Sequence, residues 1–285
     1  MRIGLHSYSC RHAFKKPGYS VFNFLDDAVN WGFESVEIVT GGAGSPPSDI
    51  GGDDPAHLKK VCAYARERNI EVHCFATYND FAFIKNENWR QDNIAYIQHW
   101  IRLAAACGVP NLRFLSGYYS DGRTNEELEK LVIDATKICC ELAEREGVNL
   151  AFENHSSIFP YANDIARLMS LVNSPRLTTC PDPTNGFSIG RGKTDDLERM
   201  YANLALLAPK ASDAHLKIFG VEDGSLVGYD IDRIIAIFAE AGYDGPLHLE
   251  LVDAEADPEI LIRARQVIKA SIERIEQGSA AGEIR

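Results

Sequence analysis

The sequence predicts a single (β/α)8 barrel, and three observations lead to this fold class. Eight short apolar segments recur along the 285 residues, and their carboxyl ends lie roughly 29 to 40 residues apart. Longer segments between them carry apolar residues at helical spacing. A strand, a crossover helix and two loops fill a repeat of this length, and eight repeats match a parallel barrel of about 250 residues.

The expected strands are the short apolar runs themselves. They cover residues 2–7, 35–40, 70–77, 111–117, 149–154, 177–182, 212–219 and 246–251. A doubly wound open sheet is the alternative, but it usually has fewer strands and a glycine-rich turn after the first one. The first strand here is followed by HSYSCRHAFKKPGYS, which is not that turn. The barrel is therefore the better prediction.

The expected helices lie between these runs and place apolar residues on one face. Residues 128–142 give the clearest helical period, and Thr124 with Glu127 predicts a capping box in front of them. Gly242 is a natural stop for a helix over residues 231–241. Further helices are expected at residues 55–69, 89–107, 161–173, 195–208 and 258–276.

Composition and the lack of linker sequences limit the classes of protein to which this chain can belong. No Gly/Ser-rich linker divides the chain, so one domain is expected over residues 1–278, with a flexible tail at 279–285. The net charge of −12 argues against a nucleic-acid partner, and no apolar run reaches the roughly 18 residues of a membrane span. Seven scattered cysteines without a C-x-x-C motif, and a start unlike a signal peptide, favour the cytoplasm.

Acidic and histidine side chains come near the carboxyl ends of four consecutive expected strands, where barrels of this class carry their active sites. They are Glu153, Asp182, His215 and Glu250. A single acidic residue at a strand end is usually a loop or capping residue, but four in succession need another explanation. Converging carboxylates repel one another unless a cation lies between them. We therefore predict one divalent metal ion, Mn²⁺, Co²⁺, Mg²⁺ or Zn²⁺, at this end of the barrel.

The segments around these four residues, LAFENHSS, CPDPTN, AHLKIFG and LHLEL, resemble the metal motifs of the xylose isomerase-like TIM-barrel superfamily, specifically its sugar (phosphate) isomerase/epimerase branch. The resemblance covers nearly the whole chain. It implies that Glu153, Asp182, His215 and Glu250 bind one divalent metal, and that the two glutamates are the proton-transfer groups. The implied activity is isomerisation or epimerisation of a carbohydrate-like small molecule through a metal-stabilised enediolate.

Other polar residues are weaker candidates for the site. His155, two residues after Glu153, is a candidate acid or base, with a loop residue as the alternative. Lys217 shares its side of the strand with His215 and could bind substrate or pair with a ligand carboxylate. The candidate substrate contacts are Lys217, Asn185, His73, Asn79, His6, Arg113 and Arg191. The long segments 7–20 and 40–55 are expected to set specificity at the barrel mouth.

The sequence leaves several functions open. Ketose 3-epimerases carry His three residues after the Asp ligand and Arg six after the His ligand, whereas this chain has Asn185 and Val221. The main alternative is a metal-dependent lyase, either an inosose or dehydroshikimate-type dehydratase or a C-glycoside-cleaving enzyme. An endonuclease IV-like enzyme, which needs more histidines, and a non-catalytic sugar-binding protein are less favoured. Both a monomer and a homo-oligomer are compatible with the sequence.

Overall fold

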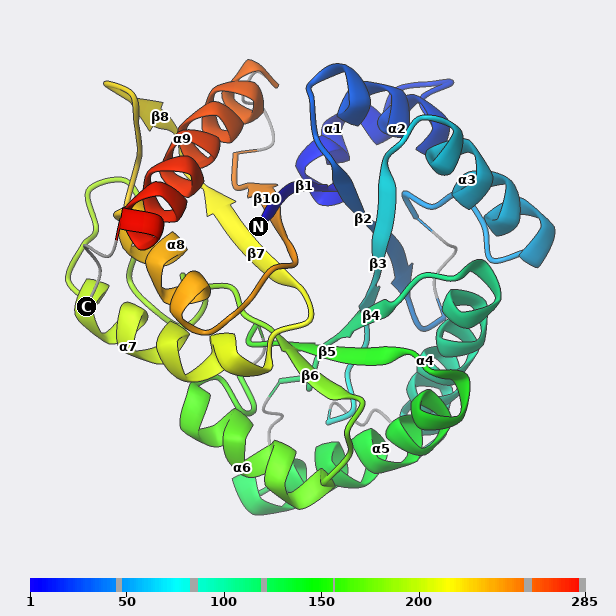
Figure 1. Cartoon of the computed structure of the whole chain (residues 1–285). Helices are drawn as coiled ribbons and strands as arrows, with labels where there is room; N and C mark the ends of the chain where they lie inside the picture. The colour runs from blue at the N-terminus through cyan, green and yellow to red at the C-terminus, as the bar shows by residue number, and fades with distance from the viewer. Residues whose placement is uncertain (45–47, 83–86, 119–121, 156, 254–257, 282–285) are drawn as a thin grey trace.

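A parallel eight-stranded barrel forms the centre of the protein, as the sequence predicts (Figure 1). The computed structural model describes residues 1–44, 48–82, 87–118, 122–155, 157–253 and 258–281. The barrel strands are β1 Arg2–His6, β2 Ser35–Gly42, β3 Glu71–Tyr78, β4 Asn111–Phe114, β5 Asn149–Glu153, β6 Leu177–Cys180, β7 Ala214–Ile218 and β10 Pro246–Leu251. Each coincides with one of the eight apolar runs.

The strands follow one another around the barrel in the order β6-β5-β4-β3-β2-β1-β10-β7. All seven neighbouring pairs in this order are parallel. Two backbone hydrogen bonds join the remaining edges, from Ser212 N to Thr179 O at 3.0 Å and from His215 N to Pro181 O at 3.1 Å. The seam between β6 and β7 is therefore the most sparsely bonded part of the ring.

Helices form an outer layer around the strands (Figure 1). They are α1 Arg11–Phe14, α2 Val21–Asn30, α3 Pro55–Glu67, α4 Glu87–Cys107, α5 Asn125–Glu146, α6 Ala162–Val172, α7 Leu197–Leu207, α8 Ile231–Glu240 and α9 Glu259–Ala281, with 3-10 turns at Ser7–Cys10 and Ala208–Lys210. The region 7–20, expected to be a long segment at the mouth, contains the first turn and α1. Apolar faces of the helices pack on the strands and form one continuous core.

The ends of α5 show how local sequence sets helix boundaries. Glu127 N donates to Thr124 Oγ1 at 3.2 Å, and Thr124 N donates to Glu127 Oε2 at 2.8 Å. This reciprocal pair is the predicted capping box, which satisfies two amide groups that the first turn leaves without partners. The helix ends at Gly147, whose φ of 74° is the left-handed conformation that glycine adopts without strain.

The carboxyl-terminal region differs in extent from the expectation. Helix α9 continues to Ala281, so residues 279–281 of the expected tail are helical, and residues 282–285 lie outside the described part of the chain.

A two-stranded hairpin of β8 Val221–Glu222 and β9 Ser225–Leu226 follows β7. Among the described helices, none is both long and apolar enough to cross a bilayer.

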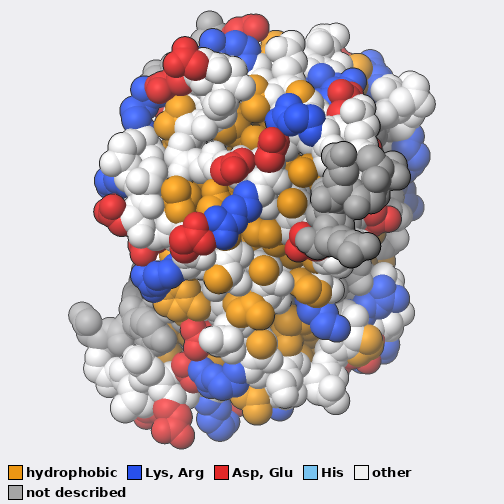
Figure 2. All heavy atoms as spheres, turned by 60° about the vertical axis from the view of Figure 1, so that its left-hand side comes forward, with side chains coloured by type: hydrophobic (Ala, Val, Ile, Leu, Met, Phe, Trp, Pro, Cys, Tyr) orange, Lys and Arg blue, Asp and Glu red, His pale blue; other side chains and the backbone are white. Residues whose placement is uncertain are grey.

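The surface mixes charges of both signs with apolar side chains. Figure 2 shows this on the side that carries α7 and α8, where Lys and Arg groups alternate with Asp and Glu groups. The net charge of −12 is therefore not gathered into one acidic face on this side. All seven cysteines are buried free thiols, in keeping with the absence of a predicted disulfide framework.

Candidate metal centre

The four predicted ligands meet inside the carboxyl end of the barrel. Glu153 ends β5, Asp182 follows β6, His215 lies in β7 and Glu250 lies in β10. One donor atom from each lies within 4.8 Å of the donor atoms of the other three. The first three side chains are fully buried, and that of Glu250 is 12% exposed. The structure thus brings together, from four consecutive barrel strands, three carboxylates and one imidazole.

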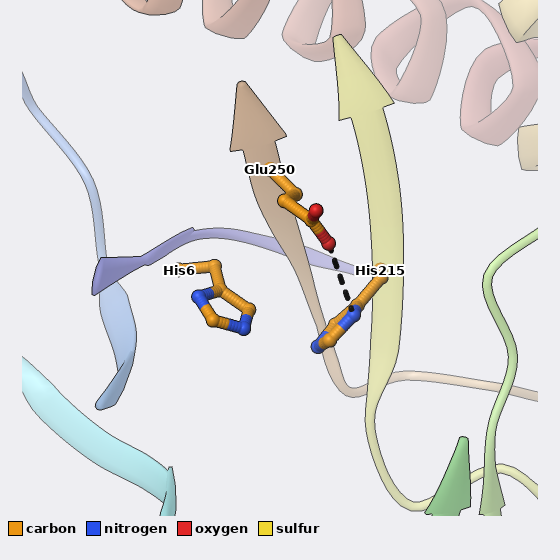
Figure 3. A group of neighbouring side chains, drawn as sticks. All are labelled: His6, His215 and Glu250. Atoms are coloured by element: carbon orange, nitrogen blue, oxygen red, sulfur yellow. Dashed lines mark ion pairs between the residues drawn. The ribbon is translucent and has the colours of Figure 1, made fainter. Parts of the chain in front are cut away.

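The imidazole of His215 faces two of these carboxylates with a nitrogen that has no hydrogen-bond partner. Its Nδ1 lies 3.8 Å from Glu250 Oε2 (Figure 3) and 3.4 Å from Glu153 Oε1, and it is buried without a hydrogen bond. A buried polar atom of this kind costs about 1–3 kcal/mol unless something binds it. Its position among carboxylates is that of a metal ligand, and oxygen donors with one imidazole suit a divalent cation.

Lys217 supplies positive charge to the cluster. Its Nζ lies 2.5 Å from Asp182 Oδ2 and 3.5 Å from Glu250 Oε2, and it donates to Asn185 Oδ1 at 2.8 Å. Burial alone would lower the pKa of Lys217, but Asp182 and Glu250 raise it, so the side chain stays an ammonium. This ion pair is the alternative that the sequence offered for Lys217.

Asn185, the residue that departs from the ketose 3-epimerase pattern, lies between Lys217 and Glu153. Its Nδ2 donates to Glu153 Oε1 at 3.1 Å while its Oδ1 accepts from Lys217. The amide thereby links a cation to an anion and holds both carboxylate and ammonium in place. Asn185 belongs to the cluster, at the position where the sequence suggested a substrate contact.

Glu37, which the sequence did not single out, completes the interior of the site from β2. Its carboxylate is fully buried and hydrogen-bonds to His215 Nε2, and it lies 3.6 Å from the Nε2 of His6. Burial would raise the pKa of Glu37, but His215 and His6 outweigh that effect and lower it. The available signal was a carboxylate in the middle of the apolar run SVEIVT, where a charge is rarely buried without a partner.

Arg113 and His6 also lie next to the cluster. Arg113 is close to Glu153 and Glu37, and His6 is close to Glu37 and His215. Arg113 Nε lies 3.3 Å from Glu153 Oε2 and 3.5 Å from Glu37 Oε1. The Arg113 side chain is buried, with 1% of its surface exposed. Burial would raise the pKa of Glu153, yet Arg113 and His215 hold it well below its ordinary value. The ring centroid of His6 lies 4.9 Å from that of His215 (Figure 3).

The structure does not bring His73 and Asn79, two predicted substrate contacts, into the cluster. His73 lies near the amino end of β3, where its Nδ1 is 3.1 Å from Glu71 Oε1 and its Nε2 3.0 Å from Ser212 O. Asn79 uses both atoms of its amide on the backbone of Leu115, at 2.7 and 2.9 Å. Their polar atoms are engaged in the scaffold, which leaves them little capacity to bind a sugar.

His155 and Arg191 lie on the outside of the site. The His155 side chain is exposed, with Nδ1 3.2 Å from the Tyr118 hydroxyl. Arg191 is 68% exposed and pairs with Glu222 of the small hairpin at 2.6 Å. Neither contacts the four clustered ligands through a hydrogen bond or ion pair that the described residues form.

A family model described as xylose isomerase-like TIM barrel matches residues 25–277. The chain belongs to this family. No curated protein matches this member of the xylose isomerase-like family by sequence.

Solved structures resemble the xylose isomerase-like barrel over nearly its full length. An L-ribulose 3-epimerase is 15% identical, with a TM-score of 0.76 and coverage of 100% of this chain and 98% of that one. A 3-keto-D-glucoside 4-epimerase from E. coli is 16% identical, with a TM-score of 0.69 and coverage of 95% and 99%. A probable 3-DHS dehydratase from Bacillus anthracis is 15% identical, with a TM-score of 0.65 and coverage of 96% and 98%. At these identities the likeness establishes the fold alone.

Proposed function

We propose that this chain is a divalent-metal-dependent isomerase or epimerase of a sugar or sugar phosphate. The observation that carries the proposal is the cluster of Glu153, Asp182, His215 and Glu250, whose donor atoms lie within 4.8 Å of one another at the catalytic end of the barrel. The unpartnered Nδ1 of His215 supports a bound cation. Bound there, a divalent ion would supply Lewis-acid polarisation of a substrate carbonyl and offset the negative charge of the ligands.

Two glutamates are available for proton transfer from different sides of the site. Glu153 comes from β5 and Glu250 from β10, and β6 and β7 lie between these strands in the ring. The Glu153 carboxylate lies 3.4 Å from His215 Nδ1, and the Glu250 carboxylate lies 3.8 Å from the same nitrogen. Glu153 is a carboxylate, because Arg113 and His215 hold its pKa well below the ordinary value against the effect of burial, and a carboxylate can accept a proton as a general base. One glutamate can then remove a proton beside the carbonyl, and the other can return one from the opposite side.

The polar groups around the glutamates would orient a hydroxylated substrate. Lys217 Nζ and the Asn185 amide both lie at the edge of the cluster, and Lys217 is 15% exposed. An ammonium that now pairs with Asp182 can turn to a substrate oxygen once a cation satisfies that carboxylate. The names of the solved relatives, two of which act as sugar 3- or 4-epimerases, agree with this reaction class.

A lyase is the second candidate, because a related barrel is named as a probable 3-DHS dehydratase. Dehydration also begins with removal of a proton beside a carbonyl, so the same base and cation serve both reactions. The outcome then depends on whether a leaving group is expelled before the proton returns.

Metal content is the deciding measurement. Inductively coupled plasma mass spectrometry on the purified parent should find about one equivalent of Mn, Co, Zn or Mg. The double variant Glu153→Gln/Glu250→Gln should lose it, whereas the control Glu126→Gln/Glu141→Gln, two exposed residues of α5, should keep it. No metal in the parent, even after soaking with each ion, would overturn the proposal.

Turnover in deuterated water separates the two reaction classes. Sugars, sugar phosphates and cyclitols are incubated with the metal-loaded protein, and recovered material is examined by NMR. Deuterium in an isomeric product without elimination identifies an isomerase or epimerase. A conjugated elimination product identifies a lyase instead.

A further inference from the structure

A cavity of about 750 Å³ is walled largely by the segments expected to set specificity, and two of its lining residues, Tyr8 and Tyr78, lie next to His6 and Arg113 of the site. Six aromatic side chains contribute to it: Tyr8, Phe14, Tyr19, Phe22, His57 and Tyr78. None of the four clustered ligands lines it. Its volume is within the range of about 300–1,000 Å³ typical of small-molecule sites, and a cavity beside the reacting centre can hold a part of the substrate that does not react.

Several aromatic rings of the wall contact one another or a neighbouring guanidinium. Phe14 and Tyr19 meet edge to face with centroids 5.2 Å apart, and Phe22 and His57 do so at 6.1 Å. The Arg11 guanidinium lies 4.2 Å over the Tyr8 ring. Aromatic walls of this kind favour a flat apolar ligand that stacks against them or meets their edges.

Most of the polar groups in the wall already have partners in the protein. Arg11 donates to the carbonyl oxygens of Leu251 and Val252 at 2.8 and 2.6 Å. The Tyr19 hydroxyl donates to Asp27 at 2.7 Å, and His57 Nε2 is 2.8 Å from Ile50 O. A second sugar ring, with several hydroxyls to satisfy, would find few partners here. An aromatic group needs none.

Two tyrosines connect the cavity with the reacting centre. Tyr8 lies with its ring centroid 6.2 Å from that of His6. The Tyr78 ring lies 4.8 Å from the guanidinium carbon of Arg113, which pairs with Glu153. A substrate that reaches the cluster with one end can therefore extend along these tyrosines into the cavity.

We propose that the cavity binds an aromatic substituent carried by the carbohydrate that reacts at the cluster, so that the substrate is an aryl-bearing sugar derivative and not a free sugar. The inference rests on the proposed function for the sugar part alone. The aromatic part is a property of the cavity and can be tested without turnover.

Isothermal titration calorimetry on the purified protein compares phenyl and methyl glycosides of glucose, galactose and xylose. The phenyl glycoside of at least one sugar should bind about fivefold or more tightly than its methyl counterpart. Ser48→Trp, which places a large ring at an exposed wall position, should abolish that difference, and Phe14→Ala should reduce it. Phe187→Ala, a half-buried aromatic outside the cavity, should retain it.

Equal affinity for phenyl and methyl glycosides, no measurable binding of any phenyl glycoside, or a preference that survives Ser48→Trp would each overturn the inference. A phenyl preference without turnover of any sugar would instead contradict only the proposed function. Turnover of free sugars without a phenyl preference would contradict only the aromatic subsite. Circular dichroism melts of each variant confirm that the comparison is made on folded protein.

Discussion

His215 hydrogen-bonds to Glu37 through one ring nitrogen and turns the other toward Glu153. Its Nε2 hydrogen-bonds to the Glu37 carboxylate, while Nδ1 lies 3.4 Å from Glu153 Oε1 without a hydrogen bond. Burial would lower the pKa of His215, but Cys180, Glu37 and Glu153 raise it well above its ordinary value. A carboxylate behind a ligating imidazole fixes the ring orientation and raises the basicity of the facing nitrogen, which releases its proton when it binds a cation.

Glu37→Gln should therefore weaken metal binding without removing a ligand. We expect the affinity for Mn²⁺ or Co²⁺ to fall about 10- to 100-fold, measured by competition with a chromophoric chelator. Glu67→Gln, an exposed residue of α3, is the matched control. An unchanged affinity would show that the Glu37 carboxylate has no part in presenting His215.

Lys217→Met should destabilise the metal-free protein and spare the metal-bound one. Without the ammonium, the buried Asp182 carboxylate loses its partner at 2.5 Å, and breaking such a pair costs about 3–5 kcal/mol. Urea unfolding in EDTA should show this loss, and saturating Mn²⁺ should recover most of it. Lys269→Met, from an exposed pair with Glu273, should change neither condition. A loss that Mn²⁺ does not recover would contradict a cation beside Asp182.

Arg113→Met should destabilise the protein with or without metal. The guanidinium lies between Glu37 and Glu153, and no metal ligand can replace it beneath the cluster. We expect a loss of about 3–5 kcal/mol in the free energy of unfolding, from urea titrations in EDTA and in Mn²⁺. Arg102→Met on the exposed face of α4 is the control. Full recovery by Mn²⁺ would show that the role of Arg113 is confined to the empty site.

Asp49→Asn should change how stability depends on pH. Burial raises the pKa of Asp49 from 3.8 to about 6, although the Ser7 hydroxyl opposes the shift. Between about pH 4 and 6 the folded chain keeps a proton that the unfolded chain releases, so raising the pH lowers the free energy of unfolding. The variant should lose this contribution, so that between pH 4 and pH 7 its free energy of unfolding should rise relative to that of the parent by up to about 3 kcal/mol. Parallel urea titrations across this range measure it; identical profiles would contradict the shift.

The strands and the clustered ligands could be predicted because both follow from local order along the chain. An apolar run such as 149–154 predicts a buried strand. Barrel geometry then brings Glu153, near the end of this run, close to the ends of the neighbouring strands. The convergence of the four side chains is seen in the structure, and metal binding by them stays a prediction. Lys217 could be placed because alternate residues of a strand share a face.

The residues that sequence reasoning misplaced depend on contacts between distant segments. His73 lies in an apolar strand, as the ligands do, but near the amino end of β3, where it contacts the backbone of Ser212 and not the ligand cluster. Asn79 follows a strand end, yet its amide is used on Leu115, 36 residues away. Glu37 went unnoticed because its partners His215, His6 and Arg113 lie on three other strands, and their convergence on it is seen only in the structure.

A metal ion bound at this site would also stabilise the sparsely bonded seam between β6 and β7. Asp182 and His215 stand on opposite sides of that seam. Among the described residues, its backbone–backbone hydrogen bonds are those from Ser212 and His215, and the Lys217–Asp182 ion pair also crosses it. A cation held by both side chains would clamp the seam from within. Local opening there would then become rarer, and the amide hydrogens of Ser212 and His215 should exchange with deuterated water more slowly when Mn²⁺ is present. The ion would therefore stabilise the closed barrel as well as act as a Lewis acid in the reaction.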